Sequence, residues 1–327
     1  MPTSTSNDAK IVEGKGLYLK YCSLCHGKDG EGYAADAANA LANQEFLALA
    51  TDEFLYASIE RGRPGTPMSA WGDSRNGPLS PEEIDAIVAW IRNWQIVEAV
   101  ELSPEPSEGV AQRGAPLYSV HCAACHGEEG GSGSYMSISN PEFLAAVPDD
   151  FLRKTIQEGR SGTPMVAYEN TIPPQGIEDL VALIRTWQKD TNAPERVEPI
   201  TELTDIISNP DGPEPGFSEG ERHISADIVH EELESGARIA LVDARPSSDY
   251  FLEHITGAVN VPFYSAEDYV EQLPQDAWIV VYCACPHAES GQVADILEAN
   301  GFTKVKVLDE GFFYWKEQGY PITSPQD

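Results

Sequence analysis

Residues 22–26, Cys-Ser-Leu-Cys-His, and residues 122–126, Cys-Ala-Ala-Cys-His, decide the fold of the N-terminal part of this chain. Cys-x-x-Cys-His is the spacing of c-type haem attachment, in which two thiols add to the porphyrin vinyl groups and the histidine ligates the iron. A single copy also occurs by chance, or in zinc and thiol-redox sites. Two copies favour two covalently bound haem c groups, attached through Cys22, Cys25, Cys122 and Cys125 and ligated by His26 and His126.

The surroundings of the two motifs are also duplicated. Residues 61–68 read Arg-Gly-Arg-Pro-Gly-Thr-Pro-Met, and residues 158–165 read Glu-Gly-Arg-Ser-Gly-Thr-Pro-Met. Each copy closes on a run with helical periodicity that ends in Ile-Arg-x-Trp-Gln. A repeat of about a hundred residues is a whole small domain. We therefore expect domains at residues 8–98 and 109–190, joined by an acidic, proline-bearing linker at 99–108.

The sixth iron ligand is expected to be methionine, whose thioether favours ferrous iron. Met68 and Met165 both follow Gly-Thr-Pro, where proline stiffens an extended loop that can present sulfur to the iron. A buried core methionine is the structural alternative. Met136 has no counterpart in the first copy and is a weaker candidate, and His121 is expected to be a solvated helix residue.

Charge and hydropathy limit the classes of partner that this chain is expected to bind. The net charge of −32 over 327 residues disfavours nucleic acid and anionic membranes, which attract basic patches. No apolar run is long enough for a transmembrane helix. Residues 1–7 lack the features of a signal peptide, yet haem c is normally attached outside the bacterial cytoplasm. We expect a periplasmic or other extracytoplasmic location, with a leader removed and a lipid anchor as an open alternative.

With these motifs, residues 8–98 and 109–190 resemble small all-α class I cytochrome c domains. In that family a glycine and an aromatic residue on the first helix pack against an aromatic residue on the last. The resemblance implies that Gly16, with Tyr18 or Leu19, packs against Trp90 or Trp94. In the second copy Leu183 replaces the first tryptophan, which leaves Trp187 for this contact.

Residues 191–220 contain five prolines and seven carboxylates against one arginine, which predicts an extended, self-repelling linker. Within it, residues 201–207 are expected to form a brief helical turn or to pack on a neighbouring domain.

The pattern changes from residue 221 to residue 327. Apolar runs at 239–243, 278–282 and 305–308 predict strands, and residues 290–300 predict a helix. This alternation indicates an α/β domain with a largely parallel sheet, whose ligands bind beyond the carboxyl ends of the strands. Residues 283–291, Cys-Ala-Cys-Pro-His-Ala-Glu-Ser-Gly, occupy such a position, where loop amides and a helix N-terminus can activate a thiol.

Three separated segments of this region resemble the rhodanese family. They are Leu-Val-Asp-Ala-Arg at 241–245, the stretch from Glu253 to Pro262, and the stretch from Leu308 to Pro321. The resemblance implies that Cys283 attacks a sulfane-sulfur donor and becomes a persulfide. It also implies framework roles for Asp243, Arg245 and His254.

The loop departs from the common rhodanese pattern. Ala288 and Glu289 stand where a basic residue is usual, and Ser290 comes one position late. The missing cation weakens the case for thiosulfate, although His287 can supply partial charge. Cys285 can resolve a Cys283 persulfide, form a disulfide with Cys283, or be inert.

The preferred hypothesis is a dihaem electron-transfer protein with a sulfurtransferase domain, in which oxidation of thiosulfate or polysulfide sulfur on Cys283 supplies electrons to a cytochrome or oxidase partner. This would make the chain a sulfurtransferase or sulfur-compound oxidoreductase. The alternative is a pure electron carrier with a non-catalytic docking domain. Substrate chemistry at a haem, as in thiosulfate dehydrogenases, is disfavoured because paired methionine ligands leave no open iron position.

Overall fold

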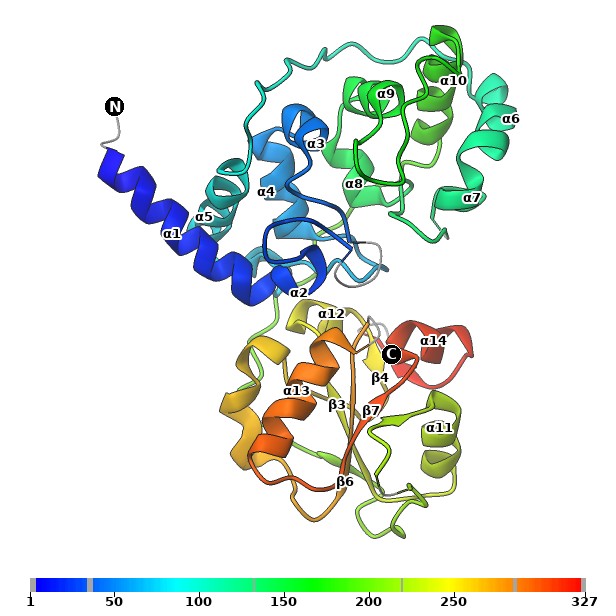
Figure 1. Ribbon diagram of the computed structural model, residues 1–327. Helices are drawn as coiled ribbons and strands as arrows, with labels where there is room; N and C mark the ends of the chain where they lie inside the picture. The colour runs from blue at the N-terminus through cyan, green and yellow to red at the C-terminus, as the bar shows by residue number, and fades with distance from the viewer. Residues whose placement is uncertain (1–3, 34–37, 132, 219, 285–286, 325–327) are drawn as a thin grey trace. The chain divides into compact units, whose positions relative to one another are not determined.

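The computed structural model describes residues 4–33, 38–131, 133–218, 220–284 and 287–324 (Figure 1). Internal contacts divide the chain into two units. The first comprises Met1–Met68 and Leu79–Ala193, and the second comprises Ser69–Pro78 and Pro194–Asp327. The fold class expected from the sequence is confirmed, since the first unit is helical and the second carries a mostly parallel sheet.

The duplicated sequence appears in the first unit as two matching sets of helices. The first set is α1 (Ser4–Tyr21), α2 (Ser23–His26), α3 (Gln44–Leu49), α4 (Asp52–Arg61) and α5 (Pro81–Arg92). The second set is α6 (Ala111–His121), α7 (Ala123–His126), α8 (Pro141–Ala146), α9 (Asp149–Glu158) and α10 (Pro174–Arg185). In each set the long first helix packs against the last, α1 on α5 and α6 on α10.

Local sequence signals start these helices. Ser80 and Glu83 form a capping box at the start of α5. The side chain of Asn43 accepts a hydrogen bond from the Phe46 amide at the start of α3, and Asn140 does the same for Phe143 in α8. The repeat therefore preserves caps as well as haem motifs.

A glycine at the same place in both copies lets the first and last helices approach closely. A Cβ atom on Gly14 would lie 1.9 Å from the Ala86 carbonyl oxygen, and one on Gly114 would lie 2.2 Å from that of Asp179. A Cβ on Gly16 would meet nothing within 4 Å. The prediction that Gly16 makes this contact is wrong by about half a helical turn, because the residue that faces α5 is Gly14.

The predicted aromatic contacts are confirmed. The ring centroids of Tyr18 and Trp94 are 5.1 Å apart at an interplanar angle of 84°, and those of Tyr118 and Trp187 are 4.9 Å apart at 77°. Each tyrosine hydroxyl also donates to a glycine carbonyl just after the haem motif, Tyr18 to Gly27 and Tyr118 to Gly127. The helix pair is thereby fixed to the segment that carries the histidine.

The second unit is built on a six-stranded sheet. Its strands are β1 (Ile207–Ser208), β2 (His223–Ile224), β3 (Ile239–Asp243), β5 (Val259–Asn260), β6 (Trp278–Tyr282) and β7 (Val305–Leu308). The order is β1-β3-β6-β7-β2, with β5 also pairing with β3. All pairs are parallel except β1 with β3. A separate antiparallel pair joins β4 (His254–Ile255) and β8 (Ile322–Thr323).

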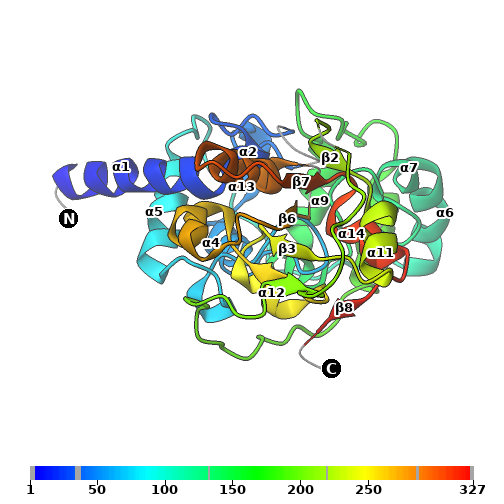
Figure 2. The same cartoon turned by 90° about the horizontal axis from the view of Figure 1, so that it is seen from below.

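Helices cover both faces of this sheet, as Figures 1 and 2 show. On one side lie α13 (Ala288–Ala299) and the 3-10 segment η2 (Phe263–Gln272); on the other lie α11 (Ala226–Glu234) and α14 (Gly311–Glu317). The strands β3, β6 and β7 are buried along their whole length, as expected for parallel strands covered on two faces. The predicted strands are confirmed, and the predicted helix begins two residues earlier, at Ala288.

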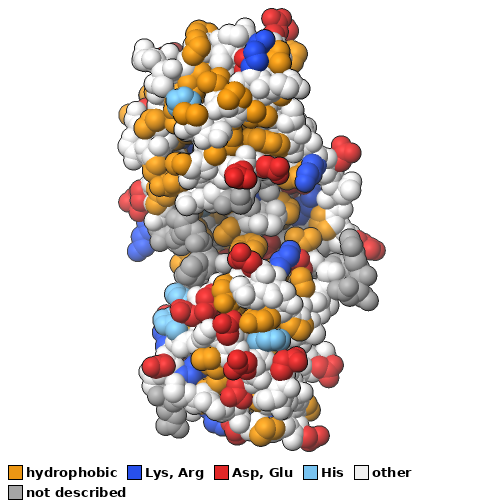
Figure 3. Space-filling model, turned by 90° about the vertical axis from the view of Figure 1, so that its right-hand side faces the viewer, with side chains coloured by type: hydrophobic (Ala, Val, Ile, Leu, Met, Phe, Trp, Pro, Cys, Tyr) orange, Lys and Arg blue, Asp and Glu red, His pale blue; other side chains and the backbone are white. Residues whose placement is uncertain are grey.

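Part of the expected linker joins the sheet. Ile207 pairs with Ala240 and Ser208 pairs with Ile239, so these residues form β1, where a helical turn was one of the two expectations. The segment 69–78, which follows Met68 in the chain, also belongs to this unit. It contains the 3-10 turn η1 (Asp73–Arg75), and Trp71 packs on Phe263 with ring centroids 6.2 Å apart. Acidic side chains outnumber basic ones on the face shown in Figure 3, as the net charge predicts.

Candidate functional sites

Each Cys-x-x-Cys-His motif forms one helical turn. The amides of His26 and His126 donate to the carbonyls of Cys22 and Cys122, each over 3.0 Å. A glycine with positive φ follows, Gly27 at 79° and Gly127 at 78°, and it turns the chain away after the histidine. The sequence therefore places two thiols and an imidazole on a short, well-defined turn in both copies.

Both motif histidines have one ring nitrogen bound to the backbone. Nδ1 of His26 lies 2.9 Å from the Asn39 carbonyl oxygen, and Nδ1 of His126 lies 2.9 Å from that of Met136. Such a bond fixes the tautomer and leaves Nε2 for a metal. Burial lowers the pKa of both histidines below the usual value, which favours the neutral imidazole that ligates iron.

The two predicted methionine loops have the same hydrogen bonds. The Arg63 amide donates to the Met68 carbonyl over 2.7 Å, and the Thr66 hydroxyl accepts from the Met68 amide over 3.2 Å. Arg160, Met165 and Thr163 repeat both bonds at the same distances. The Gly-Thr-Pro-Met tetrapeptide thus folds into one rigid loop shape that is used twice.

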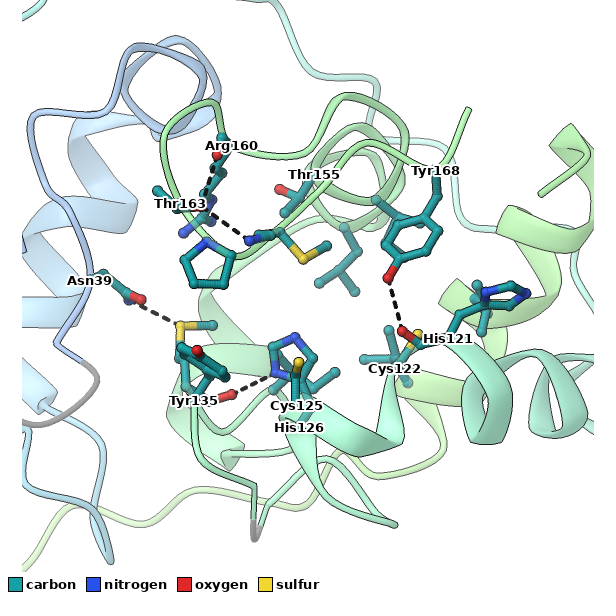
Figure 4. Close-up of a pocket in the computed structure, with 18 of the residues that line it drawn as sticks. Asn39, His121, Cys122, Cys125, His126, Tyr135, Thr155, Arg160, Thr163 and Tyr168 are labelled. Atoms are coloured by element: carbon teal, nitrogen blue, oxygen red, sulfur yellow. Dashed lines mark hydrogen bonds between the residues drawn. The ribbon is translucent and has the colours of Figure 1, made fainter. Parts of the chain in front are cut away.

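In the second copy the haem motif and the methionine loop face one cavity. The cavity has a volume of about 1040 Å³, part of it open to solvent. Cys122, Cys125, His126 and Met165 all line it. Figure 4 shows His126 on one side and the loop that carries Thr163 on the other. This arrangement fits haem c, which Cys122 and Cys125 would hold covalently and to whose iron His126 and Met165 would supply ligands.

Two further observations fit a haem in this cavity. The Thr155 hydroxyl oxygen is buried in the cavity wall and has no hydrogen-bond partner among the described residues (Figure 4). Burial raises the pKa of the Cys122 thiol to about 11 and that of Cys22 to about 12. Without a bound group, thiolates are therefore disfavoured at both positions, which argues against thiol-redox chemistry there.

The weaker candidate ligands lie elsewhere around the same cavity. Met136 lies on the side of His126, because its carbonyl binds the His126 ring, and its sulfur accepts a hydrogen bond from Asn39 over 3.1 Å. His121 packs on Tyr168, with ring centroids 5.7 Å apart. Neither Met136 nor His121 belongs to the loop that faces His126 across the cavity. That loop carries Thr163 and Met165.

Sequence reasoning missed that the first copy helps to build the second site. Tyr33 and Asn39 line the cavity, and the Tyr33 ring packs edge-on against Tyr135 at 6.5 Å. A tyrosine shortly after each haem motif was the only sequence signal, and it did not reveal which copy either ring serves.

The candidate sulfur site lies at the carboxyl end of β6. Cys283 directly follows this strand and is only 1% exposed. Its sulfur lies 3.2 Å from the Ser290 hydroxyl oxygen, and its carbonyl accepts a hydrogen bond from the Phe312 amide over 2.9 Å. Cys285, the second thiol of the loop, lies outside the described residues.

A carboxyl group, that of Glu289, lies near Cys283 where a cation is usual. Glu289 is buried, and this burial, reinforced by the nearby Cys283, raises its pKa well above the ordinary value. Burial also raises the pKa of Asp249 to about 6. His287 directs Nε2 to Asp309 over 3.1 Å. The local charge therefore does not favour a dianionic donor.

Asp243, Arg245 and His254 occupy framework positions. The Arg245 guanidinium pairs with the Asp243 carboxylate over 2.6 Å, and both groups are buried. The Tyr282 hydroxyl donates to the same carboxylate over 2.7 Å. The His254 ring stacks on Tyr250 at 3.9 Å. These contacts tie β3 to β6 and to the segment before β4.

Comparisons with known proteins also separate the two helical domains from the C-terminal α/β domain. Residues 9–91 and 109–184 match the family described as "Cytochrome C oxidase, cbb3-type, subunit III", and residues 225–318 match "Rhodanese-like domain". Over 193 residues the chain is 25% identical to the cbb3-type cytochrome c oxidase subunit CcoP of Azospirillum sp., covering 53% of this chain and 61% of that subunit. The chain thus spans about three fifths of this relative.

The C-terminal region has its own relatives. It is 36% identical over 94 residues to the thiosulfate sulfurtransferase GlpE of Pseudomonas fluorescens, covering 28% of this chain and 82% of that enzyme. The solved rhodanese-like domain of an Anabaena protein is 29% identical, with a TM-score of 0.30, and covers 32% of this chain and 80% of that one.

The described part of the chain contains no helix long and apolar enough to cross a membrane. In the first unit the haem motifs, the helix packing and the family match all indicate cytochrome c domains. In the second unit the sheet topology and the family match both indicate a rhodanese-like domain. The chain consists of two cytochrome c domains of the cbb3 subunit III type followed by a rhodanese-like domain.

Proposed function

We propose that this chain is a dihaem electron carrier whose rhodanese-like domain binds sulfane sulfur on Cys283 and supplies electrons to the haems when that sulfur is oxidised. The observation that carries the electron-transfer half is the cavity lined by His126 and Met165, in which the loop that carries Thr163 lies opposite His126. Haem c bound there would supply one-electron storage. The first copy repeats the hydrogen bonds of the histidine and of the methionine loop, which supports His26 and Met68 as the equivalent ligand pair.

The sulfur half follows from the position of Cys283 at the end of β6. Its thiolate would attack the outer sulfur of thiosulfate or polysulfide. The S–S bond of the donor breaks, its electron pair leaves with sulfite or the shortened polysulfide, and Cys283 is left as a persulfide. This exchange is redox-neutral. Later oxidation of the persulfide sulfur, with water as the source of oxygen atoms and the haems as electron acceptors, would release electrons and protons. Covalent capture keeps the sulfur on the chain that carries the haems.

The electrons would leave to a redox partner protein, a cytochrome or an oxidase. The similarity to CcoP, a subunit of a cbb3-type oxidase, supports an oxidase partner. Cytochrome c domains imply an extracytoplasmic location. The net charge of −32 suits docking on a basic surface of that partner.

One specific observation favours a second function, an electron carrier with a non-catalytic docking domain. Cys283 is 1% exposed and has the buried carboxyl group of Glu289 as a neighbour. Burial of the thiol opposes attack on an anionic donor, and the neighbouring carboxyl group, whose pKa is raised, offers no positive charge to offset this. A domain that only binds a partner would tolerate them.

Stopped-flow spectroscopy separates the two functions. Thiosulfate or polysulfide is mixed with the oxidised protein and with the Cys283→Ser variant, and the haem absorption bands are followed. Coupled chemistry predicts reduction that disappears in the variant, while dithionite reduces both proteins equally. Equal reduction in both proteins excludes the coupling. A lack of thiocyanate formation from cyanide, with no persulfide in the mass spectrum, favours the docking domain.

A further inference from the structure

Three hydrogen bonds connect the two motif histidines across the two cytochrome domains. His26 binds the carbonyl of Asn39 through Nδ1, over 2.9 Å. The carboxamide of Asn39 donates to the sulfur of Met136 over 3.1 Å (Figure 4). The carbonyl of Met136 binds Nδ1 of His126 over 2.9 Å. One side-chain contact, Asn39 to Met136, therefore joins the two residues whose backbones hold the histidines.

The partner of a ligating histidine affects the metal. A hydrogen bond from Nδ1–H to a carbonyl orients the ring and increases its basicity, and thereby its donation to the iron. In this chain both acceptors are backbone carbonyls in loops that follow the haem motifs. The position of each carbonyl depends on the position of its loop. The Asn39–Met136 contact joins the two loops, so each loop helps to hold the other in place.

This contact belongs to the symmetric interface that the repeat creates. Asn43 donates to the Ser161 carbonyl over 3.0 Å, and its counterpart Asn140 donates to the Pro64 carbonyl over 3.1 Å. These bonds relate equivalent residues of the two copies. Asn39 and Met136 are equivalent in the same way, four residues before Asn43 and Asn140, but their side chains differ and together make one bond. This bond differs from the other two because the carbonyls of the two residues that it joins bind the motif histidines.

We propose that Asn39 and Met136 are positioning residues that couple the two haem sites, so that both midpoint potentials depend on this single contact. The inference rests on the proposed function in requiring a haem on each histidine. Loss of the contact loosens both carbonyl acceptors and weakens both Nδ1–H bonds. The imidazoles then donate less to ferric iron, and both potentials rise.

Spectroelectrochemical titration of the full haem-loaded chain tests this coupling. Asn39→Leu removes the amide donor with a side chain of similar size, and Met136→Leu removes the acceptor. Each variant should raise both midpoint potentials, equivalent to about a 3- to 10-fold gain in the reduction equilibrium constant of each site. The double variant should shift them no further than either single variant, because all three lack the same contact.

Asn43→Ser is the matched control, since serine keeps the cap on α3 but cannot make the bond to Ser161. It should leave both potentials unchanged. A shift of only one potential in Asn39→Leu, additive shifts in the double variant, or an equal shift in Asn43→Ser overturns the coupling. Faster exchange of both histidine Nδ1 protons in Asn39→Leu, observed by NMR, is expected alongside the potential shifts, and unchanged exchange of either proton also overturns it.

The haem content of the same samples separates the two proposals. A wild-type chain with fewer than two covalent haems in its mass spectrum contradicts the proposed function itself. Two haems with unmoved potentials in Asn39→Leu contradict only the coupling.

Discussion

The guanidinium of Arg160, in the second cytochrome domain, lies 5.0 Å from the centre of the Phe46 ring in the first. The repeat makes the reciprocal contact as well, with Arg63 at 5.1 Å from the ring of Phe143. Burial lowers the pKa of both arginines to about 10, so both stay charged at neutral pH. Two positive charges therefore lie at the junction of the cytochrome domains, and Arg160 lines the haem cavity.

Replacing Arg160 with glutamine should lower the potential of the second haem, because a nearby positive charge favours ferrous over ferric iron. At a separation of about 10 Å and an effective dielectric constant of about 20, one charge contributes about 1.7 kcal/mol, or about 70 mV for one electron. Redox titration at constant ionic strength measures this shift. The exposed Arg196→Gln change is the control and should have little effect, because solvent screens its charge. An unchanged midpoint potential of the second haem in Arg160→Gln would show that the charge of Arg160 does not affect this potential.

Exchange of Met165 for histidine should replace a thioether ligand by a second imidazole. The potential of one haem should then fall by about 0.1–0.3 V while the other keeps its value. The long-wavelength charge-transfer band of methionine-ligated ferric haem should lose half its intensity. Met68→His should give the same result at the other haem. Retention of the full band in Met165→His would show that another residue ligates the second iron.

The features of these sites that the sequence predicts are local. The haem turn and the Gly-Thr-Pro-Met loop each span few residues, and each pattern occurs twice, so their hydrogen bonds recur at the same distances. The strands of the rhodanese-like domain are continuous apolar runs, and β3 and β6 lie where the pattern places them.

Features that depend on contacts between distant segments could not be predicted. Asn39 and Met136 occupy equivalent positions in the two copies, but a repeat in the sequence does not show which positions of one copy contact the other. Gly14 and Gly16 are both helical glycines, and only the orientation of α1 on α5 distinguishes them. The strand β1 has only two residues and lies within an acidic, proline-rich stretch whose composition does not predict a strand. Its pairing with β3 makes it a strand.

In the rhodanese-like domain, Arg245→Met should destabilise the sheet by leaving Asp243 buried without its cation. Removal of one member of a buried ion pair typically costs about 3–5 kcal/mol, and Asp243 is fully buried. Hydrogen exchange of the β6 amides reports the free energy of opening for this domain separately from the cytochrome domains. Adding Asp243→Asn should recover part of the loss, because the uncompensated charge is gone. The Arg245 guanidinium also lies 3.9 Å from the centre of the Phe312 ring. Equal destabilisation in the single and double variants would mean that loss of this packing, and not the unpaired charge, lowers the stability.

The buried carboxyl group of Glu289 should make the stability of this domain fall as the pH rises. Glutamate in the unfolded chain releases its proton near pH 4.5, whereas burial raises the folded pKa well above that value. Above pH 4.5 the unfolded state therefore binds fewer protons than the folded state, and the free energy of unfolding decreases until the folded pKa is passed. Glu289→Gln has no proton to lose, so it should match the wild type near pH 4 and exceed it at pH 8. Hydrogen exchange of the β6 amides, corrected for intrinsic exchange rates, measures both values. Equal stability of the two proteins at pH 8 would mean that Glu289 ionises without cost and that its negative charge already stands beside Cys283 at neutral pH.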